Sequence, residues 1–407
     1  MVSHTNWKPE EDLTDLTSNF RKIIDHILAF HFGPITKFTL RIPYFDICPI
    51  IDDFIHFLSR NGIQHLVLRL PIRGKPYELP SSLFTCSQLR HLTLQNCVIP
   101  HQPAFKGFDR LISLELRDVT ISCELLERFV SHCLLVEQFV LQISGASRNI
   151  IKISAPILRS NDYTGNLRCV CLKTIPLEKL SLSHREYYLG AGKCNIAKFF
   201  ELFSVLEHLH LNDMPFAAGV GEVPTRLSHD LYCVKHLSIS SIDLSDSDEV
   251  SCALCLIRSF PNLQSMEIKV ESDDNHVPPL KSLEVEHFSD VTFNHLREVK
   301  LIQTNGTIPE IQLVKLLLTK SPELERMLIV PCLVEEFATA HILAELIRFQ
   351  RASPNAEVVY NLDKHPNPQN QENLGKTKMK SGKSHPEEEE EDEYDVGSNR
   401  DATPSSK

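Results

Sequence analysis

Several residue types and patterns are scarce in this 407-residue chain, and each shortage excludes a class of protein. Tryptophan occurs once and glycine only 14 times, which argues against carbohydrate-stacking, collagen-like and glycine-rich chains. No run of roughly 18 apolar residues is present to span a bilayer. The N-terminal stretch lacks the basic flank and apolar core of a secretory signal. We therefore expect no membrane span, no export, and a cytoplasmic or nuclear location.

Positive charge is also in short supply, because Lys and Arg number 42 against 53 for Asp and Glu, giving a net charge of -11. A general nucleic-acid or anionic-membrane binder needs a dominant positive field, so neither partner is expected. Twelve cysteines in a chain without an export signal are expected to be reduced thiols that pack as small hydrophobes. What remains is a chain that binds a protein or a small molecule.

A short leucine-rich pattern is present in 13 copies. The clearest copy is LRHLTLQNCVI at Leu89, which follows the L-x-x-L-x-L spacing of a leucine-rich repeat. The other copies begin at Ile35, Ile63, Leu111, Val136, Leu167, Leu177, Leu206, Val234, Leu263, Leu280, Leu296 and Leu324. Most spacings lie in or near the range of about 20 to 29 residues that such repeats have, with short steps after Leu167, Leu263 and Leu280.

Each copy predicts a short strand whose leucines point to one side and whose polar residues point to the other. A single strand cannot cover its leucines, so neighbouring units must stack into a parallel sheet around one continuous core. Between strands the apolar spacing becomes helical, at residues 50–58, 125–133, 199–203 and 252–260. We therefore predict an α/β leucine-rich-repeat solenoid, a horseshoe with the parallel sheet on its concave face.

Composition divides the chain into four parts. These are an N-terminal extension, the solenoid, a C-terminal region and a polar tail, at residues 1–16, 17–292, 293–360 and 361–407. The solenoid opens with a helical stripe that predicts a capping helix, formed by Ile23, Ile24, Ile27 and Leu28. The tail has eight acidic residues between Glu387 and Asp395, and we expect it to be disordered because it cannot bury enough apolar surface to fold.

Two strings resemble the plant F-box/FBD/LRR-repeat protein family. One is TSNFRKIIDHILAFHFGPITKFTLRI at Thr17 to Ile42, and the other begins FNHLREVKLIQTNGTIPEIQLVKLLLTKSPELERMLI at Phe293 and ends RFQRASPNAEVVY at Tyr360. The resemblance identifies residues 293–360 as an FBD-like region. It implies the substrate-recognition part of an SCF-type ubiquitin ligase, in which an F-box docks the SKP adaptor and the repeats hold an unknown protein substrate.

The chain departs from this family ahead of the repeats, because residues 1–16 leave no room for an F-box. The SKP adaptor and cullin are therefore expected as partners only of a longer form that carries an F-box. A chain shortened at its start, a true relative without an F-box, and an inert fragment are the three alternatives.

The outward positions of the predicted strands form the candidate binding surface. The long polar side chains there are Lys37, Arg41, His65, Arg69, His91, Gln95, Arg117, His208, His210 and His236. Guanidinium groups stacked on neighbouring strands suit an anion, so an acidic segment of a partner is expected over Arg41, Arg69 and Arg117. A small phosphate-bearing ligand in the groove is the alternative, and a solvated polar face is the plainest interpretation. Glutamates accumulate on the later units, at Glu267, Glu284, Glu286 and Glu298.

Other chemistry is predicted to be absent. The five histidines belong to different strands, which favours surface polar residues over a metal site. Cys252 and Cys255 have metal-like spacing but lie in an apolar helical stripe, so we predict core thiols, whereas Cys169 and Cys171 are expected on the concave face. Asn305-Gly306-Thr307 is expected to be a turn. No catalytic motif is found, and we expect no enzyme activity, cofactor or metal.

Overall fold

The structure is a computed structural model that describes most of the chain between residues 33 and 362. The described residues are 33–42, 51–71, 75–101, 105, 107–143, 151–165, 167, 170–172, 176–183, 194–201, 203–212, 216–217, 223–271, 279–332 and 336–362, with Lys22 and His26. The predicted N-terminal extension, the apolar stripe of the capping helix and the acidic tail lie outside the described residues.

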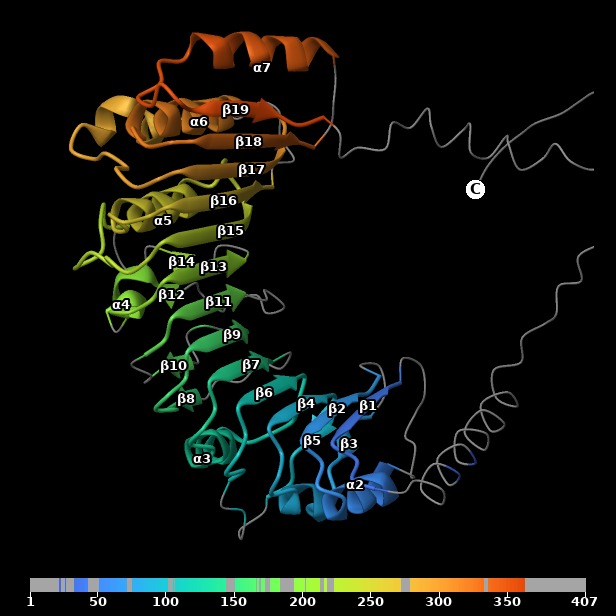
Figure 1. Ribbon diagram of the computed structural model, residues 1–407. Coiled ribbons are helices and arrows are strands. Elements are labelled where there is room, and N and C mark those ends of the chain that lie inside the picture. The colour runs from blue at the N-terminus through green and yellow to red at the C-terminus, as the bar shows by residue number, and fades with distance from the viewer. Residues whose placement is uncertain are drawn as a thin grey trace, which may run out of the picture. The chain divides into compact units, whose positions relative to one another are not determined.

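One parallel sheet of thirteen strands runs through the described part of the chain (Figure 1). Its strands, in spatial order, are β1 (Lys37–Arg41), β2 (His65–Arg69), β4 (His91–Gln95), β6 (Ser113–Arg117), β7 (Gln138–Gln142), β9 (Ser160–Thr164), β11 (Lys179–Ser183), β13 (His208–Asn212), β15 (His236–Ile242), β16 (Ser265–Val270), β17 (Glu298–Thr304), β18 (Arg326–Pro331) and β19 (Glu357–Tyr360). Spatial order equals chain order, so each unit pairs with the units before and after it. This is the topology of a leucine-rich-repeat solenoid, as predicted.

Helices and short irregular elements connect these strands on one side of the sheet (Figure 1). The helices are α2 (Ile51–Arg60), α3 (Cys123–His132), α4 (Ile196–Phe200), α5 (Ser247–Arg258), α6 (Ile308–Lys320) and α7 (Glu336–Arg348). The 3-10 helices are η1 (Ser81–Thr85), η3 (Lys281–Leu283) and η4 (Val285–Phe288). Three two-stranded sheets pair β3 (Tyr77–Glu78) with β5 (Cys97–Val98), β8 (Ile151–Ile153) with β10 (Val170–Leu172), and β12 (Cys194–Asn195) with β14 (Phe216–Ala217).

The core lies between the sheet and these connecting elements. Leu92 and Leu94 of β4 are buried, and they pair in register with the leucines of β2 and β6 on either side. The helical stripe predicted at residues 125–133 is confirmed, because α3 buries Leu125, Leu126 and Phe129 in the same core. The inward residues of the strands and the buried stripes of the helices therefore form one continuous apolar layer.

The strand predicted at Leu167 is wrong in its placement. β10 pairs with β8 in a two-stranded sheet, so Cys171 is not on the face of the large sheet, and Cys169 lies outside the described residues. β9 takes that place in the large sheet, with the sequence SNDYT. Its inward positions hold Asn161 and Tyr163, each 1% exposed, where most other units have apolar residues without polar atoms. The leucine pattern could not find this strand because Asn161 and Tyr163 stand where the pattern has aliphatic residues.

The strand predicted at Leu280 is also wrong, since η3 and η4 occupy that segment. Leu283 and Phe288 are both buried, which two-residue alternation cannot achieve, and the backbone N–H of Leu280 donates to Gln312 on α6 (2.8 Å). Glu284 and Glu286 are therefore not on the strand face. With both corrections, neighbouring strands of the sheet begin between 19 and 33 residues apart, and the shortest steps of the sequence pattern disappear.

The last three strands extend the same sheet, and helix α7 lies between β18 and β19 in the chain. The predicted turn at Asn305 to Thr307 is confirmed: Gly306 has a φ of +77°, and the backbone N–H groups of all three residues donate to the buried carboxylate of Glu310. Thr307 and Glu310 also form a capping box at the start of α6. A side chain at Gly306 would collide with Ile342 of α7, so the turn and α7 pack closely.

Candidate binding face of the sheet

The first, third and fifth side chains of each strand point away from the core, and together they form a surface that we call the strand face. All ten residues singled out in the sequence lie on it. The pairing register aligns Lys37 with His65 and His91 across β1, β2 and β4. A second row aligns Arg41, Arg69, Gln95 and Arg117. His208, His210 and His236 form a separate group on β13 and β15, with β7, β9 and β11 between them and the first two rows.

Glu115 pairs with two of the three arginines in the row of Arg41, Arg69 and Arg117. Its carboxylate accepts from Arg69 Nη2 at 3.1 Å and from Arg117 Nε, and Thr93 donates to its second oxygen at 3.1 Å. Burial raises the pKa of Glu115, but the bonds to Arg117, the charge of Arg69 and the Thr93 hydroxyl together outweigh burial and hold the pKa below its ordinary value. No sequence pattern indicated that Arg69 and Arg117 share one carboxylate. The expected anion site over Arg41, Arg69 and Arg117 stays a prediction.

Two pairs of histidines stack face to face across neighbouring strands. The ring centroids of His65 and His91 are 4.3 Å apart with an interplanar angle of 10°, and those of His208 and His236 are 4.3 Å apart at 9°. Burial lowers the pKa of His91, and the charges of His65 and Arg90 lower it further. Burial and His236 likewise lower the pKa of His208. Stacked imidazoles resist protonation because the second charge of a pair would be placed against the first.

The stacked histidines predict a loss of stability in mild acid. The pKa values of His91 and His208 are lower in the folded state than their ordinary 6.5, so the unfolded chain binds more protons in that window. Stability therefore rises with pH through the window, and it falls as the pH drops below about 6.5. We expect thermal unfolding midpoints to decrease between about pH 7.5 and about pH 5.5. A variant with both His91→Gln and His208→Gln should flatten this slope, whereas the change His295→Gln at an exposed site should leave it unaltered.

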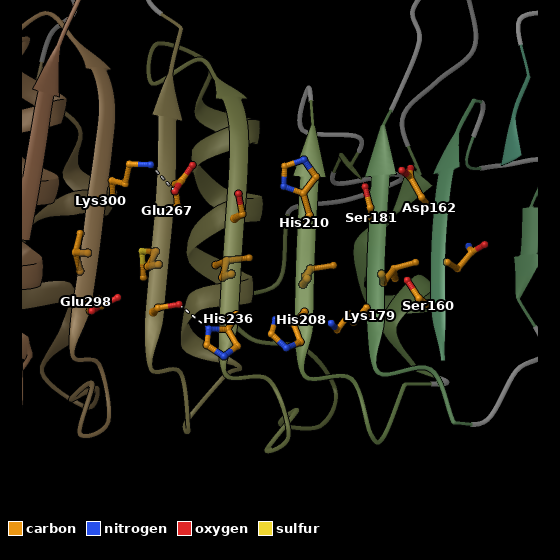
Figure 2. A pocket seen from close by; sticks show the side chains of 18 of the residues that line it. Ser160, Asp162, Lys179, Ser181, His208, His210, His236, Glu267, Glu298 and Lys300 are labelled. Carbon is orange, nitrogen blue, oxygen red and sulfur yellow. Dashed lines mark hydrogen bonds and ion pairs between the residues drawn. The ribbon is translucent and has the colours of Figure 1, made fainter. Parts of the chain in front are cut away.

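A hollow of about 630 Å³ lies on the strand face between β7 and β18 (Figure 2). Six charged side chains line it, in equal numbers of each sign: Lys179, Lys300, Arg326, Asp162, Glu267 and Glu298. Asn161, serines from β9, β11, β15 and β16, and the three histidines of the second group complete the polar lining. Figure 2 shows His208 and His236 side by side on neighbouring strands, with His210 further along β13. The charged side chains around the hollow are therefore electrically balanced.

Two hydrogen-bonded contacts fix side chains inside the hollow. Lys300 Nζ lies 2.9 Å from Glu267 Oε2, and His236 Nδ1 lies 2.7 Å from the Ser265 hydroxyl. Sequence reasoning named the three histidines but not the serines or Asp162 as site residues. Asp162 is on β9, the strand that the leucine pattern missed. The aromatic side chain of Tyr163, at an inward position of the same strand, could have indicated it.

Thiols and metal ligands contribute no site in the described residues. Cys252 and Cys255 are fully buried in α5, which confirms the prediction of core thiols, and burial raises the pKa of Cys255 to about 11. No cluster of three or more His, Cys, Asp or Glu side chains suited to a metal ion is found among the residues whose placement is known. No helix in the described part of the chain is both long and apolar enough to cross a bilayer.

Stacked repeats that present one continuous polar strand face define a leucine-rich-repeat protein-interaction module, a class that typically binds proteins and does not catalyse reactions. The family described as "FBD-associated F-box protein At5g56370, LRR repeats" matches residues 51–268. The F-box/FBD/LRR-repeat protein At1g13570 of Arabidopsis thaliana is 30% identical over 364 residues, which cover 86% of each chain. The chain therefore belongs to the plant F-box/FBD/LRR-repeat family, as its sequence predicted.

Two further Arabidopsis thaliana relatives match smaller parts of the chain. F-box/FBD/LRR-repeat protein At5g56420 is 29% identical over 147 residues, or 35% of each chain, and At5g56570 is 24% identical over 249 residues, or 54% of each. The division of the chain at residues 16, 292 and 360 stays a prediction, although β17, β18 and β19 of the FBD-like region belong to the same sheet as the repeats.

Proposed function

We propose that this chain is the substrate-recognition part of an SCF-type ubiquitin ligase and that its strand face holds the protein to be ubiquitinated. The observation that carries this proposal is the hollow on the strand face, where side chains from eight strands converge on one polar surface. Membership of the F-box/FBD/LRR-repeat family supports it, because that name joins an F-box to repeats of this kind.

The lining of the hollow suits a protein surface. Serine hydroxyls, imidazoles and balanced charges offer both donors and acceptors, so polar groups of a partner can be satisfied when water is displaced. The strands beneath are held by ladder hydrogen bonds on both sides, which keeps the lining in place without an ordering cost on binding.

Recruitment of the ligase is a separate part of the proposal. Docking of the SKP adaptor and cullin is proposed only for a form of the protein that carries an F-box. The proposed location of this substrate recognition is the cytoplasm or the nucleus. Purified chain of the present 407 residues should not retain the SKP adaptor in a pull-down, whereas a form with an F-box should.

The experiment compares two tryptophan substitutions in plant cells. Ser238→Trp places a bulky ring in the hollow, and Ser228→Trp makes the same change at an exposed site in a loop outside the strand face. We expect Ser238→Trp to lose a bound protein that the parent chain and Ser228→Trp both retain, by quantitative mass spectrometry of the purified complexes. That protein should also carry less polyubiquitin and accumulate when the form of this chain that carries an F-box is deleted.

Two results would contradict the proposal. One is an identical set of bound proteins for Ser238→Trp and Ser228→Trp, with both variants folded by circular dichroism. The other is a bound protein whose ubiquitination and abundance do not respond to deletion of the form that carries an F-box.

A further inference from the structure

We propose that the partner of the strand face carries an acidic segment, which binds across β1 to β7 over the row of Arg41, Arg69 and Arg117. The carboxylate of Glu115 competes with this segment for the arginines. This inference rests on the proposed function, because it names the chemistry of the partner that the strand face holds.

Net positive charge on the strand face is confined to its first five strands. The outward positions of β1, β2, β4, β6 and β7 hold four cations, Lys37, Arg41, Arg69 and Arg117, and one carboxylate, Glu115. The outward positions of the other eight strands hold four cations and four carboxylates. A basic surface in a chain with a net charge of -11 attracts the acidic part of a partner to this end of the sheet.

The row of donors matches an extended peptide laid across the strands. Pairing places Arg41, Arg69, Gln95, Arg117 and Gln142 side by side, one on each strand. Five strands at about 4.8 Å spacing span about 19 Å, which an extended segment of about six residues covers. Each long side chain in the row ends in N–H donors, and carboxylates are the acceptors that guanidinium groups bind most strongly.

Two of the arginines have donors left for a partner. Arg41 is exposed and makes no ion pair with a residue that the structure describes. The Nε of Arg69 is buried and has no hydrogen-bond partner among the described residues, although its Nη2 donates to Glu115. A buried donor without an acceptor is costly, and a carboxylate of the bound segment would remove that cost.

Glu115 shows what this site binds. Its carboxylate already lies between the guanidinium groups of Arg69 and Arg117 and accepts from Thr93, so the side chains are arranged around one carboxylate. Arg117 is further held by Gln142 (3.1 Å), whose amide donates to Asp118 (3.3 Å). The internal carboxylate orients the arginines and cancels one of their charges, so its removal leaves more positive charge for the partner's acidic segment.

Direct binding to the purified 407-residue chain tests the inference. The probe is a fluorescein-labelled peptide of about six alternating Glu and Asp residues, with a Gln and Asn peptide of the same length as its control, and the readout is fluorescence anisotropy. We expect the acidic peptide to bind at least about tenfold more tightly than the control, and to weaken with added salt. Arg41→Gln should weaken binding by about tenfold, since it removes one charge-assisted bond.

Matched variants separate this site from general charge attraction. Glu115→Gln should strengthen binding of the acidic peptide, whereas Lys315→Gln, which removes an exposed cation from α6 away from the strand face, should leave it unchanged. Equal binding of the two peptides, an equal effect of Arg41→Gln and Lys315→Gln, or weaker binding by Glu115→Gln would overturn the inference. A phosphoserine peptide that binds more than about tenfold tighter than the acidic peptide would overturn it in favour of phosphate recognition.

Failure of this inference and failure of the proposed function give different results. The anisotropy measurement contains no adaptor and no ubiquitin, so a negative result leaves the ligase role and the tryptophan test at Ser238 standing. Unchanged ubiquitination in cells would contradict the ligase role, but it would not affect a measured preference for the acidic peptide.

Discussion

Leu209→Asp is expected to unfold the repeats around β13 and to lower the free energy of unfolding by more than about 5 kcal/mol. Leu209 is 1% exposed and pairs in register with Leu180 and Leu237 on the neighbouring strands. Loss of the leucine costs about 3 to 5 kcal/mol in burial and cavity formation, and a carboxylate at the same place adds a desolvation penalty. Whole domains are stable by only about 5 to 15 kcal/mol, so the cooperative thermal transition should be lost.

Hydrogen exchange shows where the damage spreads. In a solenoid each unit is stabilised by its two neighbours, so protection should disappear first in β11, β13 and β15 and persist longest in distant strands. Leu209→Ala keeps the site apolar and should cost about 2 to 5 kcal/mol, which leaves a measurable transition. Leu134 is 60% exposed, so Leu134→Asp should change stability by no more than about 0.5 kcal/mol. Similar unfolding midpoints for Leu209→Asp and Leu134→Asp would contradict a continuous core at β13.

Most strands were predictable because their leucines have a single way to be covered. Leu92 and Leu94 must both be buried, and only the leucines of neighbouring units lie close enough to do this. Once the leucines point inward, alternation places His91, Thr93 and Gln95 outward. The same reasoning put every predicted site residue on the strand face.

The interactions within the face were not predictable from alternation. Register places Arg69 and Arg117 two strands apart, but their pairing with Glu115 depends on side-chain rotamers that a sequence pattern does not contain. The hollow depends on which outward residues are small, and two of its lining residues, Ser160 and Asp162, are on β9, which the leucine pattern missed. That strand could be found by spacing, because β9 divides the long step between β7 and β11 into two ordinary ones.

Asn161→Leu is expected to raise the free energy of unfolding by about 1 to 3 kcal/mol. Asn161 is 1% exposed, and neither its carboxamide oxygen nor its nitrogen has a hydrogen-bond partner among the described residues. It pairs in register with Phe139 and Leu180, so leucine at this position continues an apolar row. The substitution removes the desolvation cost of two polar atoms and adds apolar burial in their place. Urea unfolding should show a higher midpoint with an unchanged slope.

Asn294→Leu is the matched control, because the same replacement at an exposed turn changes no buried polar group and should shift stability by no more than about 0.5 kcal/mol. A gain confined to Asn161→Leu would show that this unit folds as a strand despite Asn161, held by Tyr163 and by its neighbours β7 and β11. A lower midpoint for Asn161→Leu than for the parent would contradict the prediction, since it would mean that the carboxamide stabilises the fold.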